Sequence, residues 1–139
     1  HQVRYNLLER QAEDGLFPVL SENGVGCICF SPLAQGALTD KYLRGIPAGS
    51  RAAREGSTVA ARYLDAETLG KIKKLNDIAR AGGMTLAQMA LAWILRRPEV
   101  TSVLVGASST AQLDSSLAAL KLPPLGEDVR KEIRAALGQ

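Results

Sequence analysis

Residues 24–30 read Gly-Val-Gly-Cys-Ile-Cys-Phe, and this stretch decides how the rest of the chain is interpreted. It is a nearly continuous apolar run without a charged side chain. Such runs are typical of strands that are buried on both faces, as in parallel sheets. Phe30 ends the run, and the segment that begins at Ser31 marks the carboxyl end of the expected strand.

Segments on both sides of this run supply the other strands and the helices that join them. Residues 2–5 and 101–105 are expected strands, and helices are expected over residues 14–23, 65–81, 86–97, 110–120 and around 129–137. Strands that alternate with helices in this order predict an α/β fold with a parallel sheet. Three strands alone leave two open edges, so we expect the 139 residues to be one domain that is part of something larger.

The two helices in the middle of the chain have clear sequence signals at their ends. Asp65 is suited to cap the helix over 65–81, and Gly82 with Gly83 ends it. Thr85 and Gln88 form a capping box for the next helix, which is apolar nearly all round and is expected to be buried. The apolar stripe of the first helix consists of Leu69, Ile72, Leu75 and Ile78.

The composition narrows the classes of function. Hydrophobic residues make up 46% and charged residues 22% of the chain, which is ordinary for a soluble globular protein. The net charge is +3, and the charges alternate in sign rather than forming a basic stripe, which does not favour a nucleic-acid binder. No apolar run reaches the roughly 18 residues that a membrane span needs. We therefore expect neither nucleic acid nor a membrane as a partner.

The cysteines and the histidine limit the chemistry further. Cys27 and Cys29 lie two apart in an expected strand, so both point to one face and are poorly placed for a mutual disulfide. We interpret them as small buried apolar side chains, typical of a reducing compartment, and expect a cytoplasmic protein. No Cys or His cluster predicts a metal site. The single histidine is His1, so no Ser-His-Asp arrangement can be built.

Ligands of parallel α/β folds bind outside the carboxyl ends of the strands, where this chain has three segments. The sharpest is residues 106–110, Gly-Ala-Ser-Ser-Thr, in which a glycine turn enters a helix whose N-terminus favours a phosphate. Ser and Thr are also ordinary helix caps, which is the alternative reading. The other two segments are residues 6–10 and 31–36.

A long, glycine-containing loop follows the central strand over residues 31–64. Its five cations are opposed only by Asp40 and Glu55; they are Lys41, Arg44, Arg51, Arg54 and Arg62. Such a loop either folds over an anionic ligand or is a solvated surface segment. Phe30 beside it either stacks on a flat ring or fills the core.

Several separated motifs together resemble the aldo-keto reductase family. They are Tyr-Asn-Leu-Leu-Glu-Arg at residues 5–10, Phe-Ser-Pro-Leu-Ala-Gln-Gly at 30–36, Thr-Leu-Ala-Gln-Met-Ala-Leu-Ala-Trp at 85–93, and the strand and turn over 101–108. The branch that they resemble is the bacterial glyceraldehyde-3-phosphate reductase type, with potassium-channel beta subunits as relatives. The resemblance covers essentially the whole chain. It implies the last three strand–helix units of an eight-stranded (β/α)8 TIM barrel.

The resemblance also implies a role for individual residues in binding NADP(H). Gln2 matches the glutamine that holds the nicotinamide carboxamide, and Phe30 matches the aromatic side chain that stacks on the nicotinamide ring. The loop around the pyrophosphate is matched by Ser31, Leu33, Gln35 and Gly36. The loop that closes over the cofactor, the adenosine phosphate turn and the adenine contact are matched by Lys41, Arg51, Gly106, Ser108 and Gln112.

Departures from the family pattern concern the adenosine end and the catalytic residues. Ser109 stands where an arginine often favours the 2′-phosphate, and Ser115 and Ser116 stand where Glu-Asn often contacts adenine, so the choice between NADPH and NADH is left open. The catalytic Asp, Tyr, Lys and His of the family belong to the first half of the barrel. No residue of this chain is therefore expected to be catalytic.

Two functions follow from the resemblance. One is an NADPH-dependent oxidoreductase that reduces aldehydes or ketones to alcohols, with this chain as a fragment that supplies part of the cofactor site and is inactive alone. The alternative is a non-catalytic half-barrel that binds a nucleotide or a protein partner. In either case the open sheet edges predict pairing with the missing barrel half or self-association.

Overall fold

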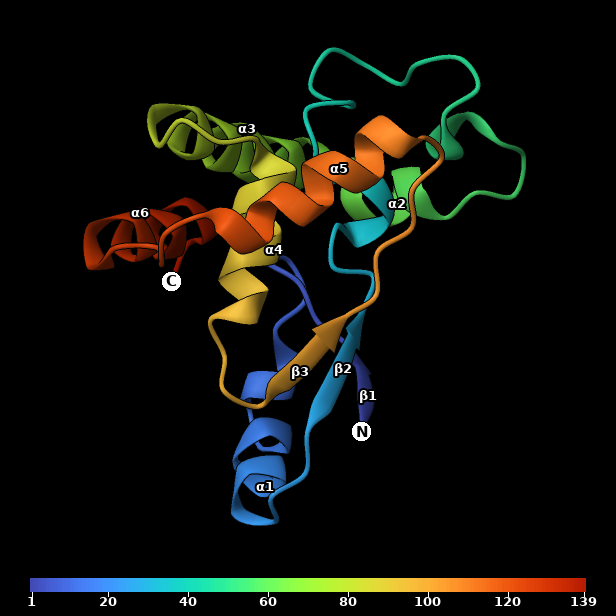
Figure 1. The fold of residues 1–139 in the computed structure, drawn as a ribbon. Helices are drawn as coiled ribbons and strands as arrows, with labels where there is room; N and C mark the ends of the chain where they lie inside the picture. Colours follow the sequence, from blue (N-terminus) through green and yellow to red (C-terminus); the bar gives the residue numbers. More distant parts are fainter.

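The computed structural model describes all residues from His1 to Gln139 and shows three strands and six α-helices (Figure 1). The strands are β1 (Gln2–Arg4), β2 (Cys27–Phe30) and β3 (Val100–Val103). The helices are α1 (Leu16–Glu22), α2 (Val59–Tyr63), α3 (Ala66–Ala81), α4 (Leu86–Leu95), α5 (Thr110–Ala118) and α6 (Glu127–Leu137). Short 3-10 turns lie at Gln11–Glu13, Ala34–Gly36, Arg51–Ala53 and Ala119–Lys121.

The three strands form one parallel sheet in the order β1-β2-β3. Gln2 lies opposite Ile28 and Arg4 opposite Phe30, while Ser102 of β3 flanks Ile28 on the other side. The expected parallel α/β arrangement is therefore confirmed. Each strand is shorter than the sequence indicated, because the flanking residues leave the ladder near glycines or enter turns.

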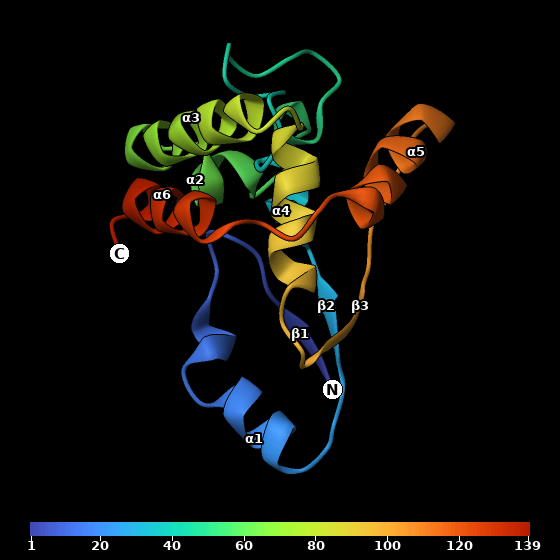
Figure 2. The same cartoon turned by 60° about the vertical axis from the view of Figure 1, so that its left-hand side comes forward.

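Helices cover only one face of the central strand, which corrects the expectation that β2 is buried on both faces. Cys27 and Cys29 are fully buried, unbridged and on the same face, as their spacing predicted. Ile28 points the other way and is 39% exposed, and Phe30 is only half-buried. Helices α1 and α4 lie on the same side of the strands in Figures 1 and 2. No element of the chain packs over the face that carries Ile28. The apolar strand β2 is therefore covered by helices on one face only.

The predicted helix signals of α3 and α4 are confirmed. The Asp65 carboxylate accepts a hydrogen bond from the backbone N–H of Thr68 at 3.0 Å and so caps α3. The Thr85 hydroxyl accepts from the N–H of Gln88, and the Gln88 side chain accepts from the N–H of Thr85, which completes the capping box. Gly83 has φ +71° just beyond the end of α3, a conformation that glycine adopts without strain. Helix α4 ends at Leu95, two residues before the expected end.

The core lies between the sheet and the layer formed by α3, α4 and α6. Tyr5 links the two parts, because its ring meets Phe17 edge-on at 4.9 Å and stacks on Trp93 at 5.2 Å. Burial raises the pKa of the Tyr5 hydroxyl, and so does the hydrogen bond that it donates to Glu13 at 2.5 Å. The stripe expected on α6 buries Ile133 and Leu137 against this core.

Two segments differ from their expected form. The region after β2 contains α2, which buries Val59 and Tyr63, so the expected structureless loop ends before residue 59. Helix α5 stops at Ala118, and a 3-10 turn completes the helical stretch. None of the residues of α5 is fully buried, and Figure 2 shows this helix projecting to one side.

No single helix has the length and apolar character to cross a membrane. Helices α3 and α4 meet the criterion only as a pair that is bent by 89°, and they do so by length and composition alone.

Candidate functional site

The three segments at the carboxyl ends of the strands lie at one edge of the sheet, as a parallel arrangement requires. Two of them are joined directly, because the side-chain amide of Asn6 donates a hydrogen bond to the carbonyl oxygen of Ser31 at 3.0 Å. The extension of β3 runs beside β2, where the N–H of Leu104 donates to the carbonyl of Cys29 at 2.8 Å. The end of β1 is thus fixed to the turn that follows β2.

Gln2 and Phe30 lie on the open face of the sheet. The register places Gln2 opposite Ile28 and Arg4 opposite Phe30, and alternation puts all four side chains on the same face. The Arg4 guanidinium carbon lies 5.4 Å from the centroid of the Phe30 ring. The Phe30 ring is thus half-buried, and the Arg4 cation lies over it.

The turn after β2 holds an unusual concentration of left-handed residues. Ser31, Ala34 and Gln35 have φ of 53°, 47° and 58°, although none of them is glycine. Backbone hydrogen bonds close the turn: Ala34 N–H donates to Ser31 at 3.0 Å, and Gly36 N–H donates to Leu33 at 2.8 Å. Such conformations cost energy and persist only where neighbouring structure holds them in place. Strain of this kind clusters at ligand sites, and four residues matched to the pyrophosphate loop lie in this turn.

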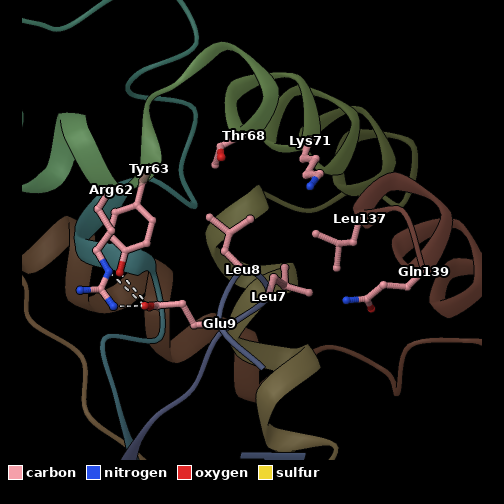
Figure 3. A pocket seen from close by; sticks show the side chains of 9 residues that line it. All are labelled: Leu7, Leu8, Glu9, Arg62, Tyr63, Thr68, Lys71, Leu137 and Gln139. Carbon is pink, nitrogen blue, oxygen red and sulfur yellow. Dashed lines mark hydrogen bonds and ion pairs between the residues drawn. The ribbon is translucent and has the colours of Figure 1, made fainter. Parts of the chain in front are cut away.

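A buried carboxylate anchors this turn and the loop beyond it (Figure 3). Glu9 is only 9% exposed and accepts hydrogen bonds from the Asn6 amide at 2.9 Å, from the Tyr63 hydroxyl at 2.7 Å, and from the Arg62 guanidinium. Arg4 adds a second cation at 3.5 Å. Because Asn6 also bonds Ser31, the network connects the end of β1, the left-handed turn and α2.

The network also sets the ionisation of its members. Burial opposes charge on Glu9, but the hydrogen bonds from Asn6, Tyr63 and Arg62 outweigh it, and the pKa of the carboxyl lies below its usual value. Burial and the bond to Glu9 raise the pKa of Tyr63 to about 12. Glu9 was not singled out from the sequence. A carboxylate that directly follows two leucines at the end of a strand is the signal that could have found it.

The turn after β3 is open to solvent and is organised by its own side chains. The Ser109 hydroxyl caps α5 by accepting from the N–H of Gln112 at 3.3 Å. The Gln112 side-chain oxygen accepts from the N–H of Ser108 at 2.9 Å and from its hydroxyl at 3.0 Å. A side chain at Gly106 would meet nothing within 4 Å. The turn thus brings Ser108 and Gln112 together, and an anion here would replace the Gln112 side chain at the Ser108 N–H.

Lys41 and Arg51 lie in the long loop after β2 and are both exposed. Lys41 borders a groove beside α3, and Arg51 begins a 3-10 turn. The loop is held by Tyr42, whose hydroxyl accepts from the N–H of Ala52 at 3.4 Å. No hydrogen bond or ion pair joins Lys41 or Arg51 to the turns after β2 and β3, so the structure does not bring these two cations into the same cluster as Phe30.

The residues present suit a dinucleotide. A half-buried aromatic ring at the end of β2 and the exposed N-terminus of α5 meet the needs of a flat ring and of a phosphate. No group of three or more His, Cys, Asp or Glu side chains is arranged to hold a metal ion. The fold and the position of these turns define the class of protein: a parallel α/β protein with its candidate site at the carboxyl ends of the strands.

A model of the aldo/keto reductase family matches residues 1–137, and the chain belongs to this family. It is 50% identical over 124 residues to an L-glyceraldehyde 3-phosphate reductase of Escherichia coli O157:H7, covering 86% of this chain and 36% of the relative. It is 42% identical over 127 residues to a probable voltage-gated potassium channel subunit beta of Oryza sativa subsp. japonica, covering 89% and 39%. It is 42% identical over 138 residues to the Protein tas of Escherichia coli (strain K12), covering 96% and 38%.

These comparisons confirm the resemblance that the motifs indicated, including the reductase branch and the channel-subunit relatives. The chain spans between 36% and 39% of the length of these relatives. The family and its reductase members make the chain part of an oxidoreductase family with a (β/α)8 barrel, and the three-stranded parallel sheet is consistent with a portion of that barrel.

Proposed function

We propose that this chain provides the cofactor-binding portion of an NADPH-dependent reductase that converts aldehydes or ketones to alcohols when the barrel is complete. In this proposal the 139 residues are one partial domain with the last three strand–helix units of the barrel. The observation that carries it is the left-handed turn directly after Phe30, on the open face of the sheet that also bears Gln2. The residue proposed to stack on the ring is therefore followed directly by the residues proposed to bind phosphate.

Each candidate residue has a defined task in this proposal. Phe30 stacks on the nicotinamide ring and Gln2 holds its carboxamide, while Ser31, Leu33, Gln35 and Gly36 surround the pyrophosphate. Gly106, Ser108 and Gln112 receive the adenosine end, and Lys41 and Arg51 belong to the loop that closes over the cofactor. NADPH, when bound, supplies the hydride. The chain contributes no proton donor, because its tyrosines are not at the catalytic positions of the family, and we expect it to be inactive alone.

The preference for NADPH over NADH depends on which residue contacts the 2′-phosphate. Ser109 is occupied as the cap of α5, so it offers a neutral hydroxyl where a cation would favour the 2′-phosphate. Arg51 is exposed and unpaired, and it is the cation that we assign to compensate. On this basis NADPH binds more tightly than NADH, and the preference depends on Arg51.

The experiment is a fluorescence titration of the 139-residue chain with NADPH and, in parallel, with NADH. Saturable NADPH binding that weakens at least about tenfold in Phe30→Ala and Arg51→Ala would support the proposal. Arg54→Ala is the matched control, because it removes a cation from the same loop at a position without an assigned contact. A folded chain that binds neither nucleotide would refute a working cofactor site in this portion.

A second candidate function is a non-catalytic half-barrel that binds a nucleotide or another chain. The open face of the sheet favours it, since Ile28, Leu104 and Val105 are exposed apolar residues at or next to the strands. The similarity to potassium-channel beta subunits also supports association with a partner. Reduction of a carbonyl compound by the purified chain would contradict this second candidate.

The substrate and the location belong to the same proposal. A small carbonyl compound is the substrate of the complete enzyme, and the missing half of the barrel or a second copy of this chain is the protein partner. The two buried and unbridged cysteines support a reducing, cytoplasmic environment.

A further inference from the structure

Arg4 places a positive charge beside the ring of Phe30. The two residues lie opposite each other in the register of β1 and β2, and the guanidinium carbon of Arg4 is 5.4 Å from the centroid of the Phe30 ring. Both side chains belong to the open face, at the carboxyl ends of their strands, where barrel enzymes bind their ligands. Arg4 is nevertheless not among the residues to which the proposed function gives a task.

The charge of Arg4 is only partly neutralised by the protein. The one carboxylate within 4.0 Å of its guanidinium is that of Glu9, which lies 3.5 Å from Nη1 of Arg4. The same carboxylate accepts a hydrogen bond from Nε of Arg62 at 3.1 Å. Two guanidinium groups therefore share one carboxylate, and two positive charges against one negative charge leave this cluster with a net charge of +1.

Contacts along the side chain keep Arg4 next to the Phe30 ring. The side chain is 31% exposed, and its Nε atom is buried without a hydrogen-bond partner. The ion pair with Glu9 and the contact with the Phe30 ring hold the guanidinium group at the far end. A partly buried charge is screened less by salt and water than an exposed one, so it acts on any charge that a ligand brings to this ring.

The two redox forms of a nicotinamide cofactor differ in the charge of the ring that is proposed to stack on Phe30. The oxidised ring carries one positive charge, whereas the reduced ring is neutral. Stacked aromatic rings have their centroids within roughly 7 Å of each other, so the nicotinamide ring and the Arg4 cation would be at most about 12 Å apart. The cation therefore repels the oxidised ring and not the reduced one.

We propose that Arg4 makes the cofactor site discriminate between the two redox forms, so that it favours NADPH over NADP⁺. This inference rests on the proposed function, in which the nicotinamide ring stacks on Phe30. Arg4 acts through its charge and requires no hydrogen bond to the cofactor. Its role is to favour loading of the site with the reduced cofactor and release of the oxidised one.

The test is a displacement titration of the 139-residue chain, in which bound NADPH is followed by its fluorescence and NADP⁺ is added as the competitor. The quantity compared between variants is the Kd of NADP⁺ divided by the Kd of NADPH. In Arg4→Gln this ratio is expected to fall at least about threefold, the effect of two unit charges about 12 Å apart at an effective dielectric constant of about 40. Arg4→Lys keeps the charge and is expected to retain the ratio of the parent chain.

The ratio separates an electrostatic role of Arg4 from a structural one. If Arg4 only supported the Phe30 ring, Arg4→Gln would weaken both forms equally, and the unchanged ratio would overturn the inference while the proposed function stood. Arg54→Ala removes an exposed cation of the loop after β2, and an equal fall of the ratio in this control would also overturn it, because net charge alone would then be the cause. A folded chain that binds neither form would refute the proposed function and this inference with it.

Discussion

Single residues carry the connections between the segments of the candidate site. Glu9 accepts hydrogen bonds from Asn6 after β1 and from Arg62 and Tyr63 in α2. Asn6 in turn donates a hydrogen bond to the carbonyl oxygen of Ser31, which begins the left-handed turn. A buried carboxylate with several charge-assisted and neutral donors is held in one orientation, because the buried Tyr63 hydroxyl would lose its acceptor if the carboxylate left. Side chains outside the turn after β2 therefore hold this turn in place.

Glu9→Gln is expected to lower the free energy of unfolding by about 2 kcal/mol, since hydrogen bonds to a charged acceptor are replaced by weaker ones. Urea unfolding followed by circular dichroism gives the value. Glu67→Gln serves as the control, because its pair with Lys71 lies at the surface and is worth less than about 1 kcal/mol. Equal effects in the two variants would contradict the role of Glu9.

The pH dependence of stability gives a second measure of Glu9. Its pKa is lower in the folded chain, so the unfolded chain binds more protons there, and its contribution is fully present above the unfolded pKa of about 4.3. The contribution is lost as the pH falls through the lowered folded pKa. The acid limb of the stability curve is therefore expected to be shallower in Glu9→Gln than in the parent.

Elements in this chain begin and end where side chains satisfy the free backbone groups. α4 starts with a complete capping box, whereas Thr58 precedes α2 without a side-chain hydrogen bond. Thr58 and Thr85 therefore both occupy the N-cap position of a helix, but only Thr85 makes a capping hydrogen bond. This contrast provides a matched pair for measuring a helix cap within one protein.

Thr85→Ala is expected to lower the free energy of unfolding by about 1 kcal/mol, and Thr58→Ala is expected to change it little. Denaturant titration of the two variants beside the parent makes the comparison. If Thr58→Ala lowered the free energy of unfolding as much as Thr85→Ala, the capping hydrogen bond would not be the cause of the destabilisation.

The entry into β2 depends on a close approach between neighbouring strands. A Cβ at Gly26 would lie 2.1 Å from the hydroxyl oxygen of Thr101, and threonine is stiff at this position because it is branched. Gly26→Ala is expected to destabilise the chain by about 2 kcal/mol. Adding Thr101→Ala should restore most of that loss in a double-mutant cycle, and simple additivity of the two changes would exclude the clash as the cause.

At the scale of the whole molecule, the sheet is covered on one face only. Ile28 is a large apolar residue in the central strand, yet it is 39% exposed. Exposed apolar surface around a sheet is typical of an interface. The open face is where we expect the missing barrel half, or a second copy, to pack.

Ile28→Glu is expected to raise the dissociation constant for self-association at least about tenfold, because a charge would be buried in the contact. Sedimentation equilibrium over a range of protein concentrations measures it. Val19→Glu is the control, since Val19 is exposed on α1, away from the open face. A parent chain that stays monomeric at the highest concentration would contradict self-association.

The sequence was sufficient wherever local chemistry decides the structure. Asp65, Thr85 and Gln88 specify the ends of α3 and α4 by hydrogen bonds within four residues, and these were predicted correctly. The exposure of Ile28 was not predicted correctly, because it depends on which elements lie over a strand. Glu9 was missed for the same reason: its environment is built from segments far apart in the chain. The roles of Phe30 and the two turns remain predictions until a nucleotide titration tests them.

The pair of cysteines beneath the helices has a consequence for reactivity. Cys27 and Cys29 are both inaccessible, and burial together with the neighbouring Cys27 raises the pKa of the Cys29 thiol. The reactive thiolate of Cys29 is therefore scarce in the folded chain at neutral pH. An alkylating reagent must wait until the helices separate from β2, so the rate of alkylation reports how often this layer opens, without any added label.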